Sequence, residues 1–122
     1  MKDLTKAEEQ VMMFLWERGE AFVKELLEDF PEPKPAYNTV STIVRILESK
    51  GFVGYTAKGK SHRYHPLIQK EEYMKHAVGG LLQNYFNGSL SGFVSFFSRQ
   101  GKLKANELDE LLKLIEEQKK KA

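Results

Sequence analysis

The sequence of 122 residues contains no cysteine and no long apolar run. The absence of cysteine excludes disulfides, thiolate metal sites, iron–sulfur clusters and cysteine nucleophiles. The longest uninterrupted apolar run, Val11–Trp16, has six residues, far short of the roughly 18 that a membrane-spanning helix needs. Five of the first ten residues are charged, so we expect no signal peptide. These features predict a soluble, cytoplasmic protein that is not inserted in a membrane.

Motifs typical of enzymes are also missing. The sequence has no glycine-rich phosphate loop and no arrangement of Ser, His and Asp suited to nucleophilic catalysis. Of its three histidines, His62 and His65 lie three residues apart in one β-prone segment, so their side chains are expected on opposite faces rather than in one ligand set. We therefore expect a protein that is not an enzyme and that uses no cofactor and no metal.

What is present suffices for a compact domain with an appended segment. Leu, Ile, Val and Phe make up 33 of the 122 residues, above the roughly 20% below which chains tend to be disordered. The net charge is only +2, yet residues 34–65 hold six basic side chains and one acidic one. This imbalance indicates a localised anion-binding surface. A chance cluster of charge on a solvated face is the alternative.

Helical spacing of apolar residues predicts three helices in the first fifty residues. The first, residues 5–18, opens with a capping box at Thr5–Glu8 and ends at Gly19. A short extended stretch at Ala21-Phe22 precedes a second helix, which ends at Pro31. The third helix spans about residues 37–50. The apolar stripe of this third helix is Val40, Ile43, Val44 and Leu47.

The opposite face of the third predicted helix is small, polar and rich in hydrogen-bonding groups. It carries Asn38, Ser41, Thr42, Arg45 and Ser49. A helix that needed only to be soluble would more often show Glu and Lys there. After this helix, two β-prone segments, residues 52–56 and 62–65, flank a glycine turn with lysines, which predicts a hairpin with a basic tip.

Three helices followed by a two-stranded hairpin is the order of a winged helix-turn-helix. We therefore predict a mainly α protein, with a winged helix at residues 1–68 and a helical dimerisation region at residues 69–122. In this class the third helix enters the major groove of DNA, and the hairpin wing lies along the phosphates. The candidate base-reading residues are Asn38, Thr39, Ser41, Thr42 and Arg45. The candidate phosphate-binding residues of the wing are Lys58, Lys60, Ser61, His62 and Arg63.

The last third of the chain is expected to form three helices, over about residues 70–87, 91–100 and 105–120. Gly79-Gly80 should destabilise the first of them by roughly 1 kcal/mol per glycine relative to Ala, which suggests a closely packed helix or a kink there. The apolar stripes are too extensive for one small bundle, which predicts a homodimer. The alternative is a lid folded on the N-terminal domain. The candidate dimer residues are Leu81, Leu82, Tyr85, Phe93, Phe96, Phe97, Leu108, Leu111, Leu112 and Ile115.

Three stretches carry a family resemblance: Leu4–Glu8 with Leu15-Trp16, residues Tyr37–Val53, and the hairpin segment Gly59–Pro66. They resemble the penicillinase-repressor family, the BlaI/MecI group of winged-helix bacterial repressors, with the CopY copper repressors as a branch. The resemblance covers nearly the whole chain and is most specific before about residue 70. It implies a homodimeric transcriptional repressor that binds a palindromic double-stranded DNA operator, often of TACA/TGTA type.

The resemblance also implies a way of inactivating the repressor. In the antibiotic-resistance members, a membrane-bound zinc metalloprotease sensor triggers cleavage before a Phe in the helix preceding the last one. The matching stretch here is Ser91–Gln100, where Ser95-Phe96 and Phe96-Phe97 are the candidate bonds. The Asn that precedes this Phe in the resistance repressors is absent. The Cys-x-Cys motifs by which CopY members sense copper are also absent.

Two other functions are compatible with the residues. The polar face of residues 38–45 would dock a protein if the winged helix were an interaction module without DNA specificity. This hypothesis predicts no measurable affinity for duplex DNA at low salt. The Phe-rich region at residues 91–100 would bind a small molecule if it had a ligand-sensing role.

Overall fold

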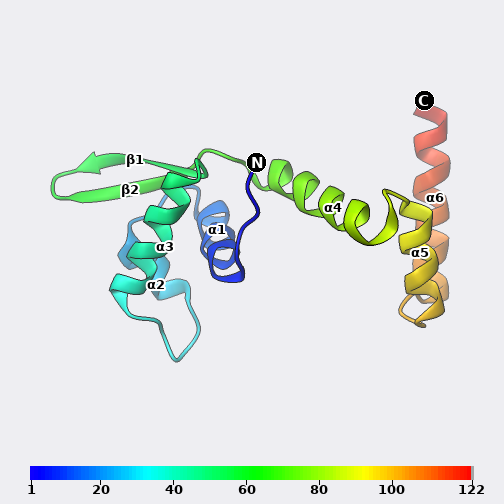
Figure 1. Ribbon diagram of the computed structural model, residues 1–122, viewed down its shortest axis with the longest axis horizontal. Helices are drawn as coiled ribbons and strands as arrows, with labels where there is room; N and C mark the ends of the chain where they lie inside the picture. Colours follow the sequence, from blue (N-terminus) through cyan, green and yellow to red (C-terminus); the bar gives the residue numbers. More distant parts are fainter. Residues whose placement is uncertain (122) are drawn as a thin grey trace. The chain divides into compact units, whose positions relative to one another are not determined.

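The computed structural model describes residues 1–121. The chain divides into two compact units, Met1–Ala77 and a second that begins at Val78. The first unit holds α1 (Lys6–Arg18), α2 (Val23–Asp29), α3 (Tyr37–Ser49), β1 (Val53–Lys58), β2 (Ser61–Pro66) and the start of α4 (Lys70–Phe86). The second holds the end of α4, α5 (Leu90–Arg99) and α6 (Ala105–Lys121) (Figure 1). The predicted order of three helices, a hairpin wing and further helices is confirmed.

The first helix begins where the sequence predicts it. The Thr5 hydroxyl accepts a hydrogen bond from the Glu8 backbone N–H at 3.2 Å, and the Glu8 carboxylate accepts one from the Thr5 N–H at 3.0 Å. This reciprocal pair is the predicted capping box, and it satisfies two backbone donors at the helix start. Gly19, with φ of 83°, follows the last residue of α1 in a left-handed conformation that glycine adopts without steric cost.

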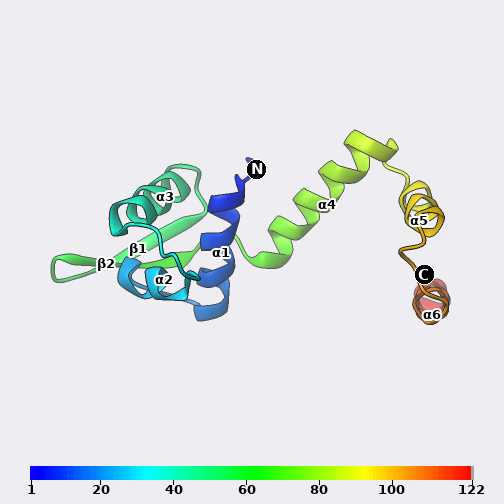
Figure 2. The same ribbon diagram turned by 90° about the horizontal axis from the view of Figure 1, so that it is seen from below.

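The wing is a two-stranded antiparallel hairpin in which Tyr55 lies opposite Tyr64. Its turn is Gly59-Lys60, so the loop is one of the tight two-residue connections. On its other edge, β2 meets the predicted extended stretch. The N–H and C=O of Ala21 each bond to Tyr64 at 2.8 Å. The wing is thereby attached to the segment between α1 and α2, as Figure 2 shows from a second side.

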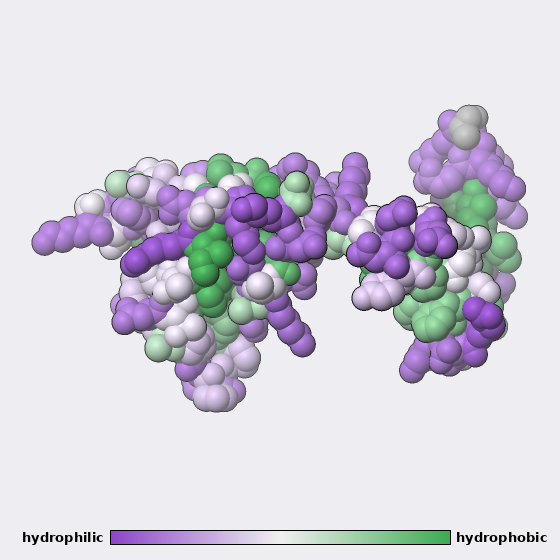
Figure 3. All heavy atoms as spheres, in the orientation of Figure 1, coloured by the Kyte–Doolittle hydropathy of each residue, from purple (hydrophilic) through white to green (hydrophobic). Residues whose placement is uncertain are grey.

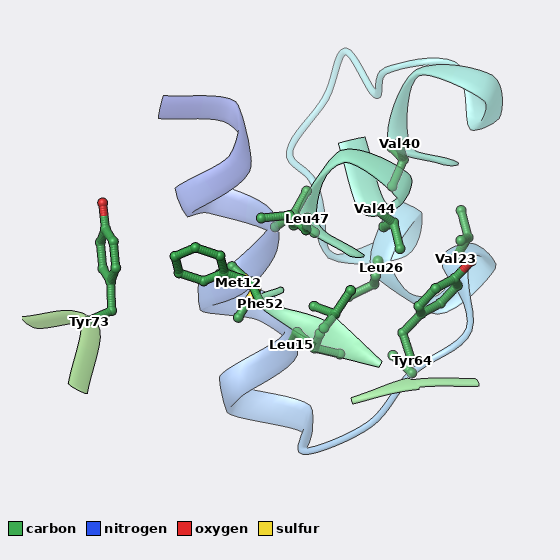
Figure 4. Close-up of a cluster of buried hydrophobic side chains, with 13 residues drawn as sticks. Met12, Leu15, Val23, Leu26, Val40, Val44, Leu47, Phe52, Tyr64 and Tyr73 are labelled. Carbon is green, nitrogen blue, oxygen red and sulfur yellow. The ribbon is translucent and has the colours of Figure 1, made fainter. Parts of the chain in front are cut away.

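One hydrophobic core holds the first unit together. It is built from α1, α2, α3, the base of the wing and one tyrosine of α4 (Figure 4). The apolar stripe of α3 supplies Val40, Val44 and Leu47 to this core, whereas Ile43 is only half-buried. Because α3 buries this stripe, its opposite polar face must point to solvent. The core therefore determines which side of α3 is available to a ligand.

The start of α4 belongs to the same unit. Tyr73 is buried, and its hydroxyl accepts a hydrogen bond from the Leu4 N–H at 3.0 Å. Trp16 donates through Nε1 to the carbonyl of Ile68 at 2.9 Å, just before the helix. His76 Nε2 lies 2.6 Å from Asp3 Oδ1. These contacts fix the first turns of α4 against α1 and the N-terminal residues.

The second unit has a different character, because none of the side chains that the structure describes in α5 or α6 is buried. Its densest contacts are among four phenylalanines of α4 and α5, whose neighbouring rings lie 4.8–6.2 Å apart: Phe86, Phe93, Phe96 and Phe97. Hydrophobic side chains lie on its surface in Figure 3. A Cβ added at Gly79 or Gly80 would meet nothing within 4 Å, so the closely packed helix predicted there is not found among residues 1–121.

Two further findings concern residues 1–121 as a whole. None of the helices there is both long enough and apolar enough to cross a membrane. No cluster of three or more His, Asp or Glu side chains in that range has the geometry to hold a metal ion.

Candidate nucleic-acid interface

A groove of about 740 Å³ lies between α2, α3 and the wing. Its walls include three side chains of α3 and three of the wing: Tyr37, Ser41, Arg45, Lys58, Lys60 and His62. The sequence predicted the base-reading residues and the phosphate-binding residues from separate signals. In the fold, members of both sets line the same groove.

The candidate base-reading residues occupy the solvent face of α3. Asn38, Thr39, Thr42 and Arg45 are exposed, whereas Ser41 is half-buried in the wall of the groove. Arg45 donates from Nη2 to the Ser41 hydroxyl at 3.4 Å, one helical turn earlier. This long contact orients the guanidinium along the helix and leaves most of its fork of donors available. Bidentate donation to a guanine edge requires such a fork.

The hydroxyl of Thr42 is used within the helix. Thr42 Oγ1 donates to the carbonyl of Asn38 at 2.9 Å. This is the back-bond that Ser and Thr commonly make four residues earlier in a helix. The Thr42 side chain is still exposed, so its methyl group is accessible to the solvent.

The tip of the wing supplies exposed positive charge. Lys58, Lys60, Ser61 and His62 are all exposed, and the lysines flank the turn at Gly59. Within residues 1–121, neither lysine has a carboxylate within 4.0 Å. Behind the tip, the His62 ring stacks on Tyr55 with centroids 4.0 Å apart and planes 10° from parallel. The stack stiffens the hairpin directly behind its charged tip.

Arg63 is placed differently from the lysines. Successive residues of a strand point to opposite faces, and Arg63 does not line the groove. Its Nη1 lies 3.2 Å from Glu20 Oε1, and its guanidinium stands 5.1 Å from the centre of the Phe22 ring. Its Nε is buried without a hydrogen-bond partner in the described chain. Its charge is therefore partly compensated, and its contacts hold the wing against the segment before α2.

Several groove residues lie outside the sets predicted from the sequence, and two of them bear on DNA binding. Lys24, the second residue of α2, and Tyr37, the first residue of α3, both line the groove. The signal for Lys24 was its place in the first turn of the helix preceding the third, since that helix crosses the DNA backbone in helix-turn-helix proteins. The neighbouring Glu25 carboxylate is engaged, because it accepts from the Phe22 N–H at 2.9 Å and pairs with Arg18.

Two ion pairs hold α3 and its neighbours in place. Lys50, at the end of α3, binds the carboxylate of Glu8 on α1. Burial alone would raise the pKa of Glu8, but hydrogen bonds from Lys50 and from Thr5 together hold that pKa below its usual value. Arg18 binds Asp29 at the end of α2 with Nε–Oδ2 at 2.7 Å, and this hydrogen bond lowers the pKa of the Asp29 carboxyl.

The tyrosine at the base of the groove remains protonated. Tyr64, in strand β2 of the wing, is buried, and burial together with the charge of Glu48 raises the pKa of its phenol. It therefore adds no negative charge to the groove at neutral pH.

Comparison with known proteins gives matches over nearly the whole chain. A family model described as "Penicillinase repressor" matches residues 4–117. The penicillinase repressor of Bacillus licheniformis is 25% identical over 117 residues, which cover 95% of this chain and 91% of that protein. The methicillin resistance regulatory protein MecI of Staphylococcus aureus strain N315 is 21% identical over 114 residues, 93% of each chain.

A solved structure matches more than half of the chain. The solution structure of the DNA binding domain of the repressor BlaI aligns with a TM-score of 0.51 at 23% identity. The alignment covers 60% of this chain and 94% of that domain. At this level of identity the match shows the fold, which is a winged helix.

Proposed function

Because the chain belongs to the penicillinase repressor family, we propose that it is a transcriptional repressor that binds a specific double-stranded DNA operator and is not an enzyme. One observation carries this proposal. A single groove is lined by hydrogen-bonding side chains of α3 and by the exposed lysines of the wing, Lys58 and Lys60. A base-reading surface beside a phosphate-binding surface is what sequence-specific binding requires.

In the proposed complex, residues 1–68 bind one half of the operator. The exposed face of α3 enters the major groove, where Arg45 donates to a guanine edge and Asn38 pairs with an adenine edge. Thr39, Ser41 and Thr42 complete that face. The wing follows the backbone, and Lys58 and Lys60 neutralise phosphates while Ser61 and His62 donate hydrogen bonds to them. Arg63 acts mainly by holding the wing in position, because Glu20 already shares its charge.

We further propose that residues 69–122 form a homodimer. A single chain buries none of the apolar side chains of α5 and α6 that the structure describes and leaves several of them exposed, and exposed patches of this kind mark interaction sites. A second copy would cover the residues predicted for this role: Leu81, Leu82, Tyr85, Phe93, Phe96, Phe97, Leu108, Leu111, Leu112 and Ile115. A two-fold dimer presents two recognition helices, so its operator would be palindromic.

Proteolysis is the proposed route of inactivation. The family resemblance suggests a membrane-bound zinc metalloprotease sensor as the trigger and α5 as the target. Ser95, Phe96 and Phe97 are exposed in the single chain, and the candidate bonds Ser95-Phe96 and Phe96-Phe97 lie inside the helix. A protease binds extended peptides, so cleavage would require local opening of α5. In a single chain that opening costs little free energy, because α5 has no buried residue there.

The proposed function is tested by fluorescence anisotropy with labelled duplex DNA. The duplex from upstream of the gene is compared with a scrambled duplex at two salt concentrations. We expect tight, salt-sensitive binding that favours the upstream duplex. Equal weak binding to both would contradict specificity for that site, and no binding at low salt would contradict DNA binding and favour the protein-interaction module.

A further inference from the structure

The recognition face of α3 carries an apolar pair within an otherwise polar surface. Thr42 is exposed, but its hydroxyl donates to the Asn38 carbonyl at 2.9 Å. With its oxygen turned back toward the helix, the side chain presents its γ-methyl group to a partner. Thr42 therefore offers a ligand an apolar contact rather than a hydrogen-bond donor.

Ile46 lies one turn further along the same helix. Residues four apart are neighbours on a helix surface, so Ile46 adjoins Thr42. Ile46 is 40% exposed, whereas Val40, Val44 and Leu47 fill the core side of α3. Single exposed apolar residues are common, but this one extends the patch begun by the Thr42 methyl group. We define these two side chains as the α3 apolar pair.

The chemistry of the major groove identifies the group that such a pair would contact. Base edges there present hydrogen-bond donors and acceptors, and one apolar group, the 5-methyl of thymine. We propose that the α3 apolar pair, Thr42 and Ile46, recognises the 5-methyl group of a thymine in each half-site. The inference rests on the proposed DNA-binding function. It adds a T·A base pair to the guanine and adenine edges that Arg45 and Asn38 are proposed to recognise.

Two substitutions at Thr42 separate the methyl from the hydroxyl. Thr42→Val keeps the methyl group and loses the hydroxyl, whereas Thr42→Ser keeps the hydroxyl and loses the methyl. Because the site is exposed, both variants are expected to remain folded. Ile46→Ala truncates the second member of the pair. Met13→Ala removes an exposed apolar side chain from α1 and is the matched control.

The experiment begins with full-length protein and a pool of randomised duplexes, from which a bound sequence is selected. Each thymine of one half-site is then replaced by 2′-deoxyuridine, which removes only the 5-methyl group. Affinities are measured by anisotropy. For the unaltered protein we expect at least one position where this replacement weakens binding about fourfold, the ratio that corresponds to ~0.8 kcal/mol for one buried methyl group.

The variants complete a double-mutant cycle between protein and DNA. For Thr42→Ser or Ile46→Ala, we expect uracil at the same position to have a reduced effect or none. For Thr42→Val and Met13→Ala, the fourfold effect should persist. Retention of the thymine preference by Thr42→Ser together with its loss in Thr42→Val would overturn the proposal, because the hydroxyl would then be the reading group.

Two other outcomes separate this inference from the function on which it rests. A selected duplex whose affinity is unchanged by uracil at every position would overturn the methyl contact and leave sequence-specific binding intact. Failure of the protein to enrich any sequence, with no binding at low salt, would overturn the proposed function itself.

Discussion

The two kinds of positive charge on the wing should differ in their effect on the salt dependence of DNA binding. Lys60 is exposed at the turn and has no carboxylate within 4.0 Å among residues 1–121, whereas Arg63 lies 3.2 Å from Glu20. Each phosphate neutralised by a protein contributes about 0.9 to the slope of log affinity against log salt. A dimer carries Lys60 twice, so Lys60→Ala should flatten this slope by about 1.8.

Arg63→Ala should behave differently, because the Arg63 charge is already shared with Glu20. We expect a smaller change of slope than for Lys60→Ala. Its main effect should be on stability, since the contact with the Phe22 ring holds the wing in place. Glu20→Ala tests the pairing from the other side. By freeing the Arg63 charge, it should steepen the slope or leave it unchanged.

The assay is anisotropy of a labelled operator duplex over 50–200 mM salt, with the scrambled duplex in parallel. Lys60→Ala should weaken binding to both duplexes alike, because phosphate contacts carry no sequence information. Lys104→Ala, outside the first unit, is the matched control and should leave the slope unaltered. Equal slopes for Lys60→Ala and the unaltered protein would refute the assignment of the wing tip to phosphates. Equal loss of slope in Arg63→Ala and Lys60→Ala would refute the inference from the ion pair.

Three further predictions concern the recognition helix, the assembly and the response to acid. Arg45→Ala should lose roughly 1–3 kcal/mol at one base pair of each half-site, measured on a set of base-substituted duplexes; unchanged affinity for operator and scrambled DNA would contradict its assignment. Removal of the residues from 91 onward should give a monomer, measured by sedimentation, that binds the operator more weakly. A mass near 14.1 kDa for the full-length protein at micromolar concentration would contradict the dimer. Folding lowers the pKa of Glu8 below its ordinary value of 4.5 and the pKa of Asp29 below 3.8. The ion pairs of these carboxylates therefore stabilise the folded state fully at pH values above 4.5 and 3.8, respectively. This stabilisation is lost as the pH falls through the lowered pKa values. Urea unfolding at several pH values should therefore show a steeper loss in acid for the unaltered protein than for Glu8→Gln, and identical pH profiles would argue against the Glu8–Lys50 pair.

Local signals explain why so much of the first unit was predictable. The capping box at Thr5–Glu8 satisfies its own backbone groups, so four residues of sequence determine where α1 begins. The stripe of Val40, Val44 and Leu47 has a helical period and fixes the inward face of α3. The pairing of Tyr55 with Tyr64 follows from a tight turn between two β-prone segments. In each case the residues that determine the structure are close together in the sequence.

The features that escaped prediction depend on partners far along the chain or on side-chain orientation. The pairing of Arg63 with Glu20 requires the wing to meet the segment before α2, which no local pattern encodes. Lys24 joins the groove only because α2 packs beside α3. The Thr42 hydroxyl could bond to DNA or to its own helix, and composition does not distinguish the two. The contact assignments for DNA and for the dimer remain predictions.

If the chain dimerises as proposed, the distribution of charge and apolar surface predicts that the dimer could be released from DNA without any change in the groove. The positive charge at the groove of one chain is limited to a few side chains, among them Arg45, Lys58 and Lys60. Each winged helix alone would therefore bind DNA weakly and with little preference. Joining two such domains makes the second binding event intramolecular, which raises the overall affinity by a large factor without any new contact. In the proposed dimer that gain would come from the apolar faces of α5 and α6, on which the structure describes no buried side chain within one chain. A cut in α5 would therefore act on affinity through the loss of this linkage, while Arg45 and Lys60 kept their geometry. A fusion protein in which a foreign dimerising segment replaces residues 91–122 should consequently bind the operator and resist the protease. If this fusion dimerises but fails to bind the operator, α5 and α6 must do more than join two chains.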